Sequence, residues 1–143
     1  MTNPENYIKL EIDARSENVT LTRVISAAFI SPLDPTVGEI SDIKTAISEA
    51  VTNAIIHGYG EGEGIVSISL ASNGREITIE VSDSGIGIEN IDNAREPLFT
   101  TKPEMERSGL GFTVMESFMN EVHVTSTPGT GTTIKMKKTL GAN

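Results

Sequence analysis

The strongest constraint on this chain is a stripe of apolar residues between positions 43 and 55. These residues recur at steps of three and four, and they are Ile43, Ala46, Ile47, Ala50, Val51, Ala54 and Ile55. This spacing places all of them on one face of an α-helix, which must pack against a second layer to bury that face. Gly58 and Gly60 follow the stripe and are predicted to end the helix.

Alternating apolar residues predict five strands around this helix. The strands are centred on Ile8–Ile12, Val66–Leu70, Ile77–Val81, Val122–Val124 and Ile134–Met136. The turn signal Ser72-Asn73-Gly74 joins the second and third strands into a hairpin, and residues 128–131 join the last two.

Two further helices complete the predicted pattern. Ser16 can cap a helix whose apolar face would be formed by Leu21, Val24, Ile25, Ala28 and Phe29. Pro32 and Pro35 predict a loop over residues 31–38, and the apolar residues from Phe112 to Met119 predict the last helix. The order β, α, α, β, β, α, β, β indicates an α+β two-layer sandwich, with a mixed, mainly antiparallel sheet covered on one face by helices.

Length and composition limit the possible functions. We expect a single domain over residues 1–143, and a formal net charge of −9 argues against partners such as nucleic acid or an anionic membrane. The absence of cysteine excludes disulfides, thiolate metal sites and thiol nucleophiles. The segment MTNPENYIKLEID does not resemble a signal peptide and no apolar run reaches membrane-spanning length, so a cytoplasmic location is expected.

Four short motifs, taken together, predict a nucleotide site. In order they are Glu49-x-x-x-Asn53, Asp83-x-Gly85-x-Gly87, Gly109-x-Gly111 and Gly129-Thr-Gly-Thr-Thr133. The chain contains neither G-x-x-x-x-G-K-[ST], the motif of P-loop proteins, nor G-x-G-x-x-G, the motif of dinucleotide-binding folds. Its motifs therefore exclude these two ways of binding phosphate. Each motif alone is weak, and their common order carries the prediction.

The first motif suits a metal ion and a proton acceptor. Glu49 and Asn53 are four residues apart, so their side chains lie side by side on the predicted helix. A carboxamide oxygen is a suitable Mg²⁺ ligand, because Mg²⁺ takes its other oxygens from water and phosphate. Glu49 can accept a proton from an attacking hydroxyl group. The alternative is that both side chains only solvate the helix flank.

The second and fourth motifs suit an adenine base. Asp83 follows a strand and can accept a hydrogen bond from the adenine amino group, while Gly85 and Gly87 let the backbone approach a flat ring. Thr132 can place a hydroxyl beside Asp83. The alternative for both motifs is an ordinary turn, since Asp and Gly are common turn residues.

The third motif suits phosphate. Gly109 and Gly111 precede a predicted helix, whose free backbone N–H groups can bind phosphate oxygens. Residues 97–108, with Lys102 and Arg107, could form a lid that brings a cation to the terminal phosphate. The alternative is an exposed polar loop.

Together these motifs resemble the N, G1, G2 and G3 boxes of the ATPase and kinase superfamily that includes gyrase, Hsp90, histidine kinases and MutL, whose members share the Bergerat-type ATP-binding fold. The segments SEAVTNAIIHGY, PLFTTKPEMERSGLGFTVME and ARSEN further resemble bacterial anti-sigma factors that are also serine protein kinases. The strongest resemblance is to the anti-sigma F group of spore-forming bacteria.

The resemblance implies a homodimeric protein that holds off an RNA polymerase sigma factor and phosphorylates a serine of an anti-anti-sigma factor. It implies ATP and Mg²⁺ as cofactors and ADP as product. Asp83 and Thr132 would recognise adenine, Asn53 would ligate Mg²⁺ and Glu49 would be the general base. The four motif glycines would shape the pocket, and they are Gly85, Gly87, Gly109 and Gly111. Arg107 would reach the γ-phosphate, and Arg23 would contact the sigma factor.

Two departures from the superfamily narrow the expected activity. The chain has no helical hairpin with a phosphoacceptor histidine and no transducer domain, which argues against histidine autophosphorylation and an ATP-driven clamp. A competing hypothesis is a nucleotide-responsive module that sequesters a general stress sigma factor with little or no kinase activity. The presence of Glu49 favours the kinase, because binding adenine and Mg²⁺ needs no base.

Overall fold

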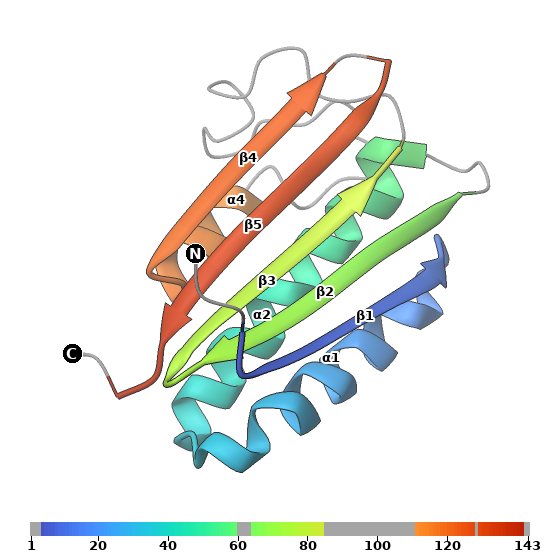
Figure 1. Cartoon of the computed structure of the whole chain (residues 1–143). Helices are drawn as coiled ribbons and strands as arrows, with labels where there is room; N and C mark the ends of the chain where they lie inside the picture. The colour runs from blue at the N-terminus through green and yellow to red at the C-terminus, as the bar shows by residue number, and fades with distance from the viewer. Residues whose placement is uncertain (1–3, 60–63, 85–110, 128, 142–143) are drawn as a thin grey trace.

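The computed structural model describes residues 4–59, 64–84, 111–127 and 129–141. Five strands form one sheet in the order β1-β2-β3-β5-β4 (Figure 1). Their bounds are β1 Asn6–Asp13, β2 Ile65–Asn73, β3 Glu76–Asp83, β4 Glu121–Thr127 and β5 Gly131–Thr139. Every pairing between these strands is antiparallel, so the described sheet contains no parallel pair.

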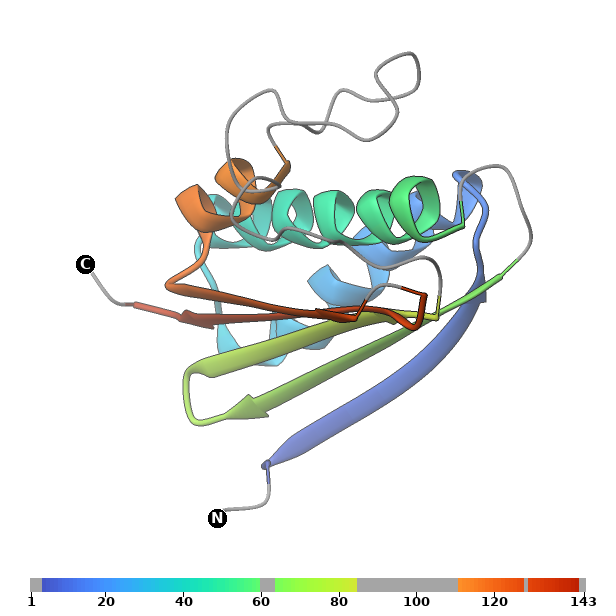
Figure 2. The same cartoon turned by 90° about the horizontal axis from the view of Figure 1, so that it is seen from above.

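The helices form a single layer on one face of this sheet, as Figure 2 shows from above. They are α1 Glu17–Ile30, α2 Val37–Asn53 and α4 Gly111–Phe118, with a short 3₁₀ helix η1 Ser31–Leu33 and a π-helical segment η2 Ala54–Tyr59. Helix α2 packs against both α1 and α4. The predicted α+β two-layer architecture is confirmed, and within the described ranges no helix is both long and apolar enough to cross a membrane.

The core lies between α2 and the inner face of the sheet. Six of the seven residues of the apolar stripe are buried, from Ile43 to Ala54, and Ile55 is half-buried against them. The predicted end of this helix was wrong in detail. The α-helix ends at Asn53 and the chain continues as π-helical η2, in which the backbone is wound more widely.

The buried face of α1 is only partly the predicted one, because Phe29 is buried and Ile25 is half-buried, but Ala28 is exposed. Leu21 is 47% exposed and Val24 is 60% exposed, whereas Thr22 and Ser26 are buried. Their hydroxyl groups donate to backbone carbonyl oxygens one turn earlier on the same helix, at 2.7 and 2.9 Å. Because these hydroxyls are satisfied within the helix, two small polar side chains can be buried without an unpaired donor.

The start of α1 and the loop before α2 also differ from expectation. Ser16 occupies the N-cap position, but its side chain makes no capping hydrogen bond. Instead, the carbonyl of Ser16 accepts from the backbone N–H of Val19 at 3.1 Å. The predicted loop over residues 31–38 contains η1 and the first two residues of α2, which starts from a capping box between Thr36 and Glu39.

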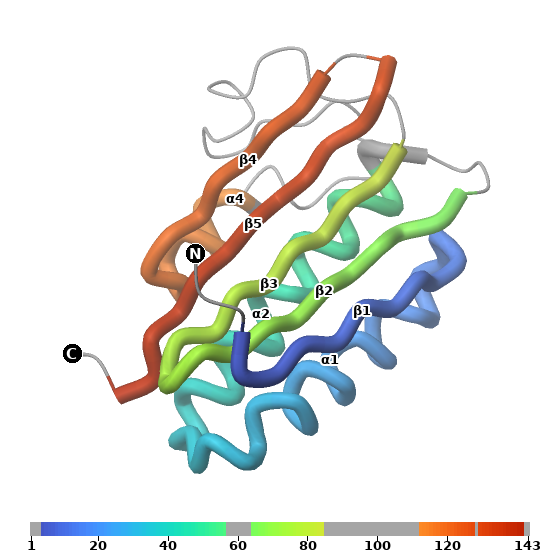
Figure 3. The backbone as a smooth tube through the Cα atoms, viewed as in Figure 1, coloured from blue at the N-terminus to red at the C-terminus, as the bar shows by residue number. Residues whose placement is uncertain are grey.

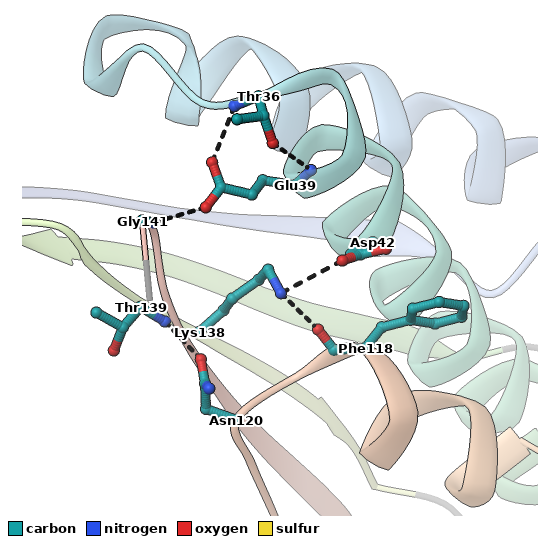
Figure 4. Close-up of polar contacts among 8 residues, drawn as sticks. All are labelled: Thr36, Glu39, Asp42, Phe118, Asn120, Lys138, Thr139 and Gly141. Atoms are coloured by element: carbon teal, nitrogen blue, oxygen red, sulfur yellow. Dashed lines mark hydrogen bonds and ion pairs between the residues drawn. The ribbon is translucent and has the colours of Figure 1, made fainter. Parts of the chain in front are cut away.

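A group of polar contacts joins the first turn of α2 to the end of β5, and we call it the anchor cluster (Figure 4). Its residues are Thr36, Glu39, Asp42, Phe118, Asn120, Lys138, Thr139 and Gly141. Glu39 accepts hydrogen bonds from the backbone N–H of Thr36 at 2.9 Å and of Gly141 at 2.6 Å. Lys138 lies 3.4 Å from Asp42 and donates at 2.8 Å to the carbonyl of Phe118, the last residue of α4. The cluster therefore ties α2, α4 and β5 together at one end of the molecule.

Candidate functional site

The opposite end of α2 carries the first predicted motif. Asn53 is 6% exposed and Glu49 is half-buried, one turn earlier on the same helix. The η2 segment that continues α2 contacts β3 and β5. Figure 1 shows this end of α2 beside the tip of β3 and the start of β5. The helix therefore brings Glu49 and Asn53 to the end of the sheet that carries the second and fourth motifs.

Asp83 and Thr132 face each other across two neighbouring strands. Asp83 is the last residue of β3, and its register partner on β5 is Thr132. Thr132 is 8% exposed and lies on the same strand face as the buried Ile134 and Met136, so it points toward the helix layer. The expected position of Thr132 beside Asp83 is confirmed. Two oxygen-bearing side chains are thus paired at the edge of the core.

Gly131 allows β3 and β5 to approach this closely. Its φ angle is +131°, a conformation that side chains of L-residues rarely adopt. A Cβ atom at this position would overlap the carbonyl oxygen of Asp83 and lie 2.8 Å from the Cα atom of Ser84. A glycine is therefore required here for both conformation and space.

Two hydroxyl pairs flank the Asp83–Thr132 pair, and sequence reasoning missed both. Ser126 on β4 lies opposite Thr132, with their hydroxyl oxygens 2.8 Å apart. Ser82 and Thr133 form a second pair at 2.8 Å on the other face of the sheet. The alternation of β4 was a usable signal, because Ser126 follows Val122 and Val124 on the inward-facing positions.

The third motif is only partly visible. Gly111 is the first residue of α4, whose apolar side chains Phe112 and Met115 are buried. Five other predicted residues lie outside the described residues, and they are Gly85 and Gly87 of the second motif, Gly109 of the third motif, and Lys102 and Arg107 of the predicted lid. The predicted lid over residues 97–108 also lies outside them.

Arg23 lies on a different helix from Glu49 and Asn53. It is an exposed residue of α1, which packs against α2 on the side away from α4. The residue expected to contact a sigma factor therefore belongs to a different element from the residues expected to hold a nucleotide.

The donor set suits a purine nucleotide with Mg²⁺. Glu49, Asn53, Asp83 and Thr132 all present oxygen atoms, the ligand type that Mg²⁺ prefers, and Asn53 offers a neutral carboxamide oxygen. A carboxylate paired with a hydroxyl suits recognition of an amino group. Among the residues that the structure describes, no group of three or more His, Cys, Asp or Glu side chains is arranged to hold a metal ion. A Mg²⁺ ion bound by Asn53 would share its coordination with phosphate oxygens.

Comparisons with known proteins identify the family of this chain. The model of the histidine kinase-like ATPase domain family matches residues 12–138. The anti-sigma F factor of Clostridium kluyveri is 54% identical over 138 residues, covering 96% of this chain and 97% of the relative. The anti-sigma F factors of Clostridium acetobutylicum and Geobacillus thermodenitrificans are 58% and 56% identical over 134 residues each. The former alignment covers 94% of both chains; the latter covers 93% of this chain and 92% of the relative.

Solved structures share the fold at low sequence identity. The RsbU and RsbW domains of Rv1364c from Mycobacterium tuberculosis superpose with a TM-score of 0.68 at 21% identity. That match covers 96% of this chain and 32% of the longer one. The catalytic domain of the histidine kinase ThkA superposes with a TM-score of 0.57 at 16% identity, covering 95% of this chain and 97% of that domain.

Proposed function

Because this chain belongs to the histidine kinase-like ATPase family and to the anti-sigma F factors within it, we propose that it is an ATP-dependent anti-sigma factor. It binds and inhibits an RNA polymerase sigma factor, the sporulation sigma factor F. It also uses Mg-ATP to phosphorylate a serine of its anti-anti-sigma factor, with ADP as the second product. The observation that carries the nucleotide part is the Asp83–Thr132 pair at the end of the helix that bears Glu49 and Asn53.

Each described residue has a distinct task in this proposal. Asp83 and Thr132 accept hydrogen bonds from the base, directly or through water, and thereby orient the nucleotide. Asn53 holds Mg²⁺ together with phosphate oxygens, and the ion, when bound, neutralises charge on the transferred phosphoryl group. Gly111 lies at the N-terminus of α4, where backbone N–H groups face phosphate. Gly85, Gly87 and Gly109 complete the pocket wall in this proposal, and Arg107 reaches the terminal phosphate.

Glu49 acts as the general base. The serine oxygen of the partner attacks the γ-phosphorus and its proton passes to the Glu49 carboxylate. The bond between the γ-phosphorus and the bridging oxygen breaks, and ADP leaves with the electron pair of that bond. Phosphoryl transfer depends mainly on positioning and charge neutralisation, so α2 contributes by carrying the base and the metal ligand one turn apart.

The proposed partner contacts and oligomeric state are those that the resemblance to anti-sigma factors implies. We propose a single-domain, cytoplasmic homodimer that binds no nucleic acid or membrane directly. The exposed Arg23 on α1 contacts the sigma factor in this proposal. Arg23→Ala is expected to weaken sigma binding in a pull-down while leaving ATP affinity unchanged, because Arg23 is exposed on α1, which carries none of the proposed nucleotide residues.

The kinase activity is tested with γ-labelled Mg-ATP and purified anti-anti-sigma protein. Wild type is expected to label one serine, and Glu49→Gln is expected to lose at least a hundredfold in rate while still binding ATP. Glu76→Gln, which removes an exposed carboxylate at the far end of β3, is the matched control and should retain full activity. Sigma binding without serine labelling by wild type would favour the sequestering module over the kinase.

A further inference from the structure

We propose that Ser126 sets the direction of the Thr132 hydroxyl group and so contributes to the choice of adenine over a 6-oxopurine base. Ser126 is a positioning residue in this proposal, since it acts through Thr132 and not on the base. The inference rests on the proposed function, because it takes Asp83 and Thr132 as the base-recognition side of the pocket.

The direction of the hydrogen bonds follows from proton counting. The hydroxyl oxygen of Ser126 lies 3.2 Å from the carbonyl oxygen of Gly131 and 2.8 Å from the hydroxyl oxygen of Thr132. A carbonyl oxygen only accepts, and a serine hydroxyl has one proton to donate. When Ser126 donates to Gly131, Thr132 must therefore donate to Ser126. The relay runs from Thr132 through Ser126 to Gly131.

This relay leaves the Thr132 oxygen with lone pairs for any further neighbour. Asp83, Thr132 and Ser126 form one row across β3, β5 and β4, and the row faces the helix layer. Thr132 is 8% exposed, so bulk water does not compete freely for its hydroxyl group. A ligand beside Asp83 would thus meet two acceptors, a carboxylate and the oxygen of Thr132.

Two acceptors side by side discriminate at position 6 of a purine. The amino group of adenine donates hydrogen bonds, which suits both oxygens directly or through a bridging water. The carbonyl oxygen of a 6-oxopurine is itself an acceptor, so it faces lone pairs and loses the hydrogen bonds it makes in water. Without Ser126, the Thr132 hydroxyl can rotate and donate to that carbonyl.

The test compares the binding of ATP and inosine triphosphate by calorimetry in the presence of Mg²⁺. Inosine triphosphate has a carbonyl group at position 6 and, unlike GTP, no amino group at position 2. Wild type is expected to prefer ATP, and Ser126→Ala is expected to reduce this preference about fivefold, the worth of one neutral hydrogen bond. Ser126→Thr keeps the hydroxyl group and should restore the preference. Thr125→Ala, an exposed neighbour on the opposite face of β4, is the control.

A double-mutant cycle with Thr132→Val separates positioning from structural support. If Ser126 acts through Thr132, Ser126→Ala has no further effect on the ATP preference in the Thr132→Val background. An effect of equal size in both backgrounds would overturn the inference, since Ser126 would then act by supporting the turn through Gly131. An unchanged preference in Ser126→Ala would also overturn it. Failure of wild type to bind ATP at all would overturn the proposed function itself, and thermal melting confirms that each variant is folded.

Discussion

The two ends of α2 differ in where their polar groups lie. At its first turn, Glu39 and Asp42 are engaged by the chain itself, through backbone N–H groups and Lys138 (Figure 4). At its last turn, Glu49 and Asn53 stand beside the strand ends that carry the candidate base-recognition residues. The two ends are about 25 Å apart, from a rise of 1.5 Å per residue over α2.

The difference indicates that one end of α2 serves folding stability and the other end serves ligand binding, and we call this the division between the two ends. The anchor cluster fixes α2 to α4 and β5, so it contributes to folding stability. The other end supplies groups whose chemistry suits a ligand, and changes there should affect binding more than stability. Substitutions at the two ends test this division.

The largest effect is expected at Gly131, where a substitution should reduce both folding stability and nucleotide binding. Gly131→Ala places a Cβ atom against the Asp83 backbone in a strained conformation, and should cost about 3 kcal/mol in the free energy of unfolding. The displaced β3 end should also weaken ATP binding at least tenfold. Urea denaturation and calorimetry measure the two quantities.

Gly129 provides the matched control in the same hairpin turn. Its φ angle is +81°, but a Cβ atom there would meet nothing within 4 Å. Gly129→Ala should therefore show only the conformational cost, about 1 kcal/mol, with normal ATP affinity. Equal effects of the two substitutions would contradict the close contact between Gly131 and Asp83.

Asp83→Asn should act mainly on nucleotide binding. The amide can donate as well as accept, so the preference for ATP over GTP should disappear, and ATP affinity should fall about thirtyfold with the loss of a charged acceptor. The free energy of unfolding should change by less than the free energy of ATP binding does. Asp13→Asn at the exposed end of β1 is the control. Unchanged selectivity on calorimetry would count against the adenine assignment.

Lys138→Met should show the opposite pattern. It leaves Asp42 and the Phe118 carbonyl without their shared cation, and should lower the free energy of unfolding by about 2 kcal/mol. ATP affinity should stay within about twofold of wild type, because the site lies at the other end of α2. Lys137→Met removes a neighbouring charge on the other face of β5 and should be nearly neutral. A large loss of ATP affinity in Lys138→Met would break the proposed division.

The smallest effect concerns acid stability. The hydrogen bond from the backbone N–H of Thr36, followed by that of Gly141, lowers the pKa of the Glu39 carboxyl from its ordinary value of 4.5. A lowered pKa means that Glu39 contributes stability above pH 4.5, and that this contribution is lost as the pH falls through the folded-state pKa. Glu39→Gln should remove this part of the pH dependence, whereas Glu11→Gln should not. The same dependence of the free energy of unfolding on pH in wild type and Glu39→Gln, from pH 7 to pH 3.5, would contradict this prediction.

The sequence predicted the elements whose apolar residues recur with the period of a helix or a strand. The stripe of α2 and the alternation of the strands gave the two layers, because burial and periodicity agree there. The face of α1 was predicted only in part. Apolar spacing favours Leu21 and Val24, and a sequence pattern cannot show that Thr22 and Ser26 bond within their own helix.

The candidate site was predicted only in part, because a sequence pattern does not show the contacts that depend on strand register. Motif order placed Asp83 and Thr132 near each other, but their direct pairing depends on the register between β3 and β5. Ser126 carries no motif of its own, and its contact with Thr132 follows only from the β4–β5 register. The sequence therefore predicted types of residues more fully than the contacts that orient them.

The position of β5 has a consequence for how the protein is made. Figure 3 shows this last strand running between β3 and β4, although both precede it in the chain. During synthesis, Asp83 emerges well before Thr132, and the pair cannot form until β5 enters the sheet. A ligand that contacts both residues would bind only the finished sheet and would stabilise the inserted strand by mass action. Nucleotide would then bind molecules in which β5 is inserted in the sheet and not molecules in which it is still outside.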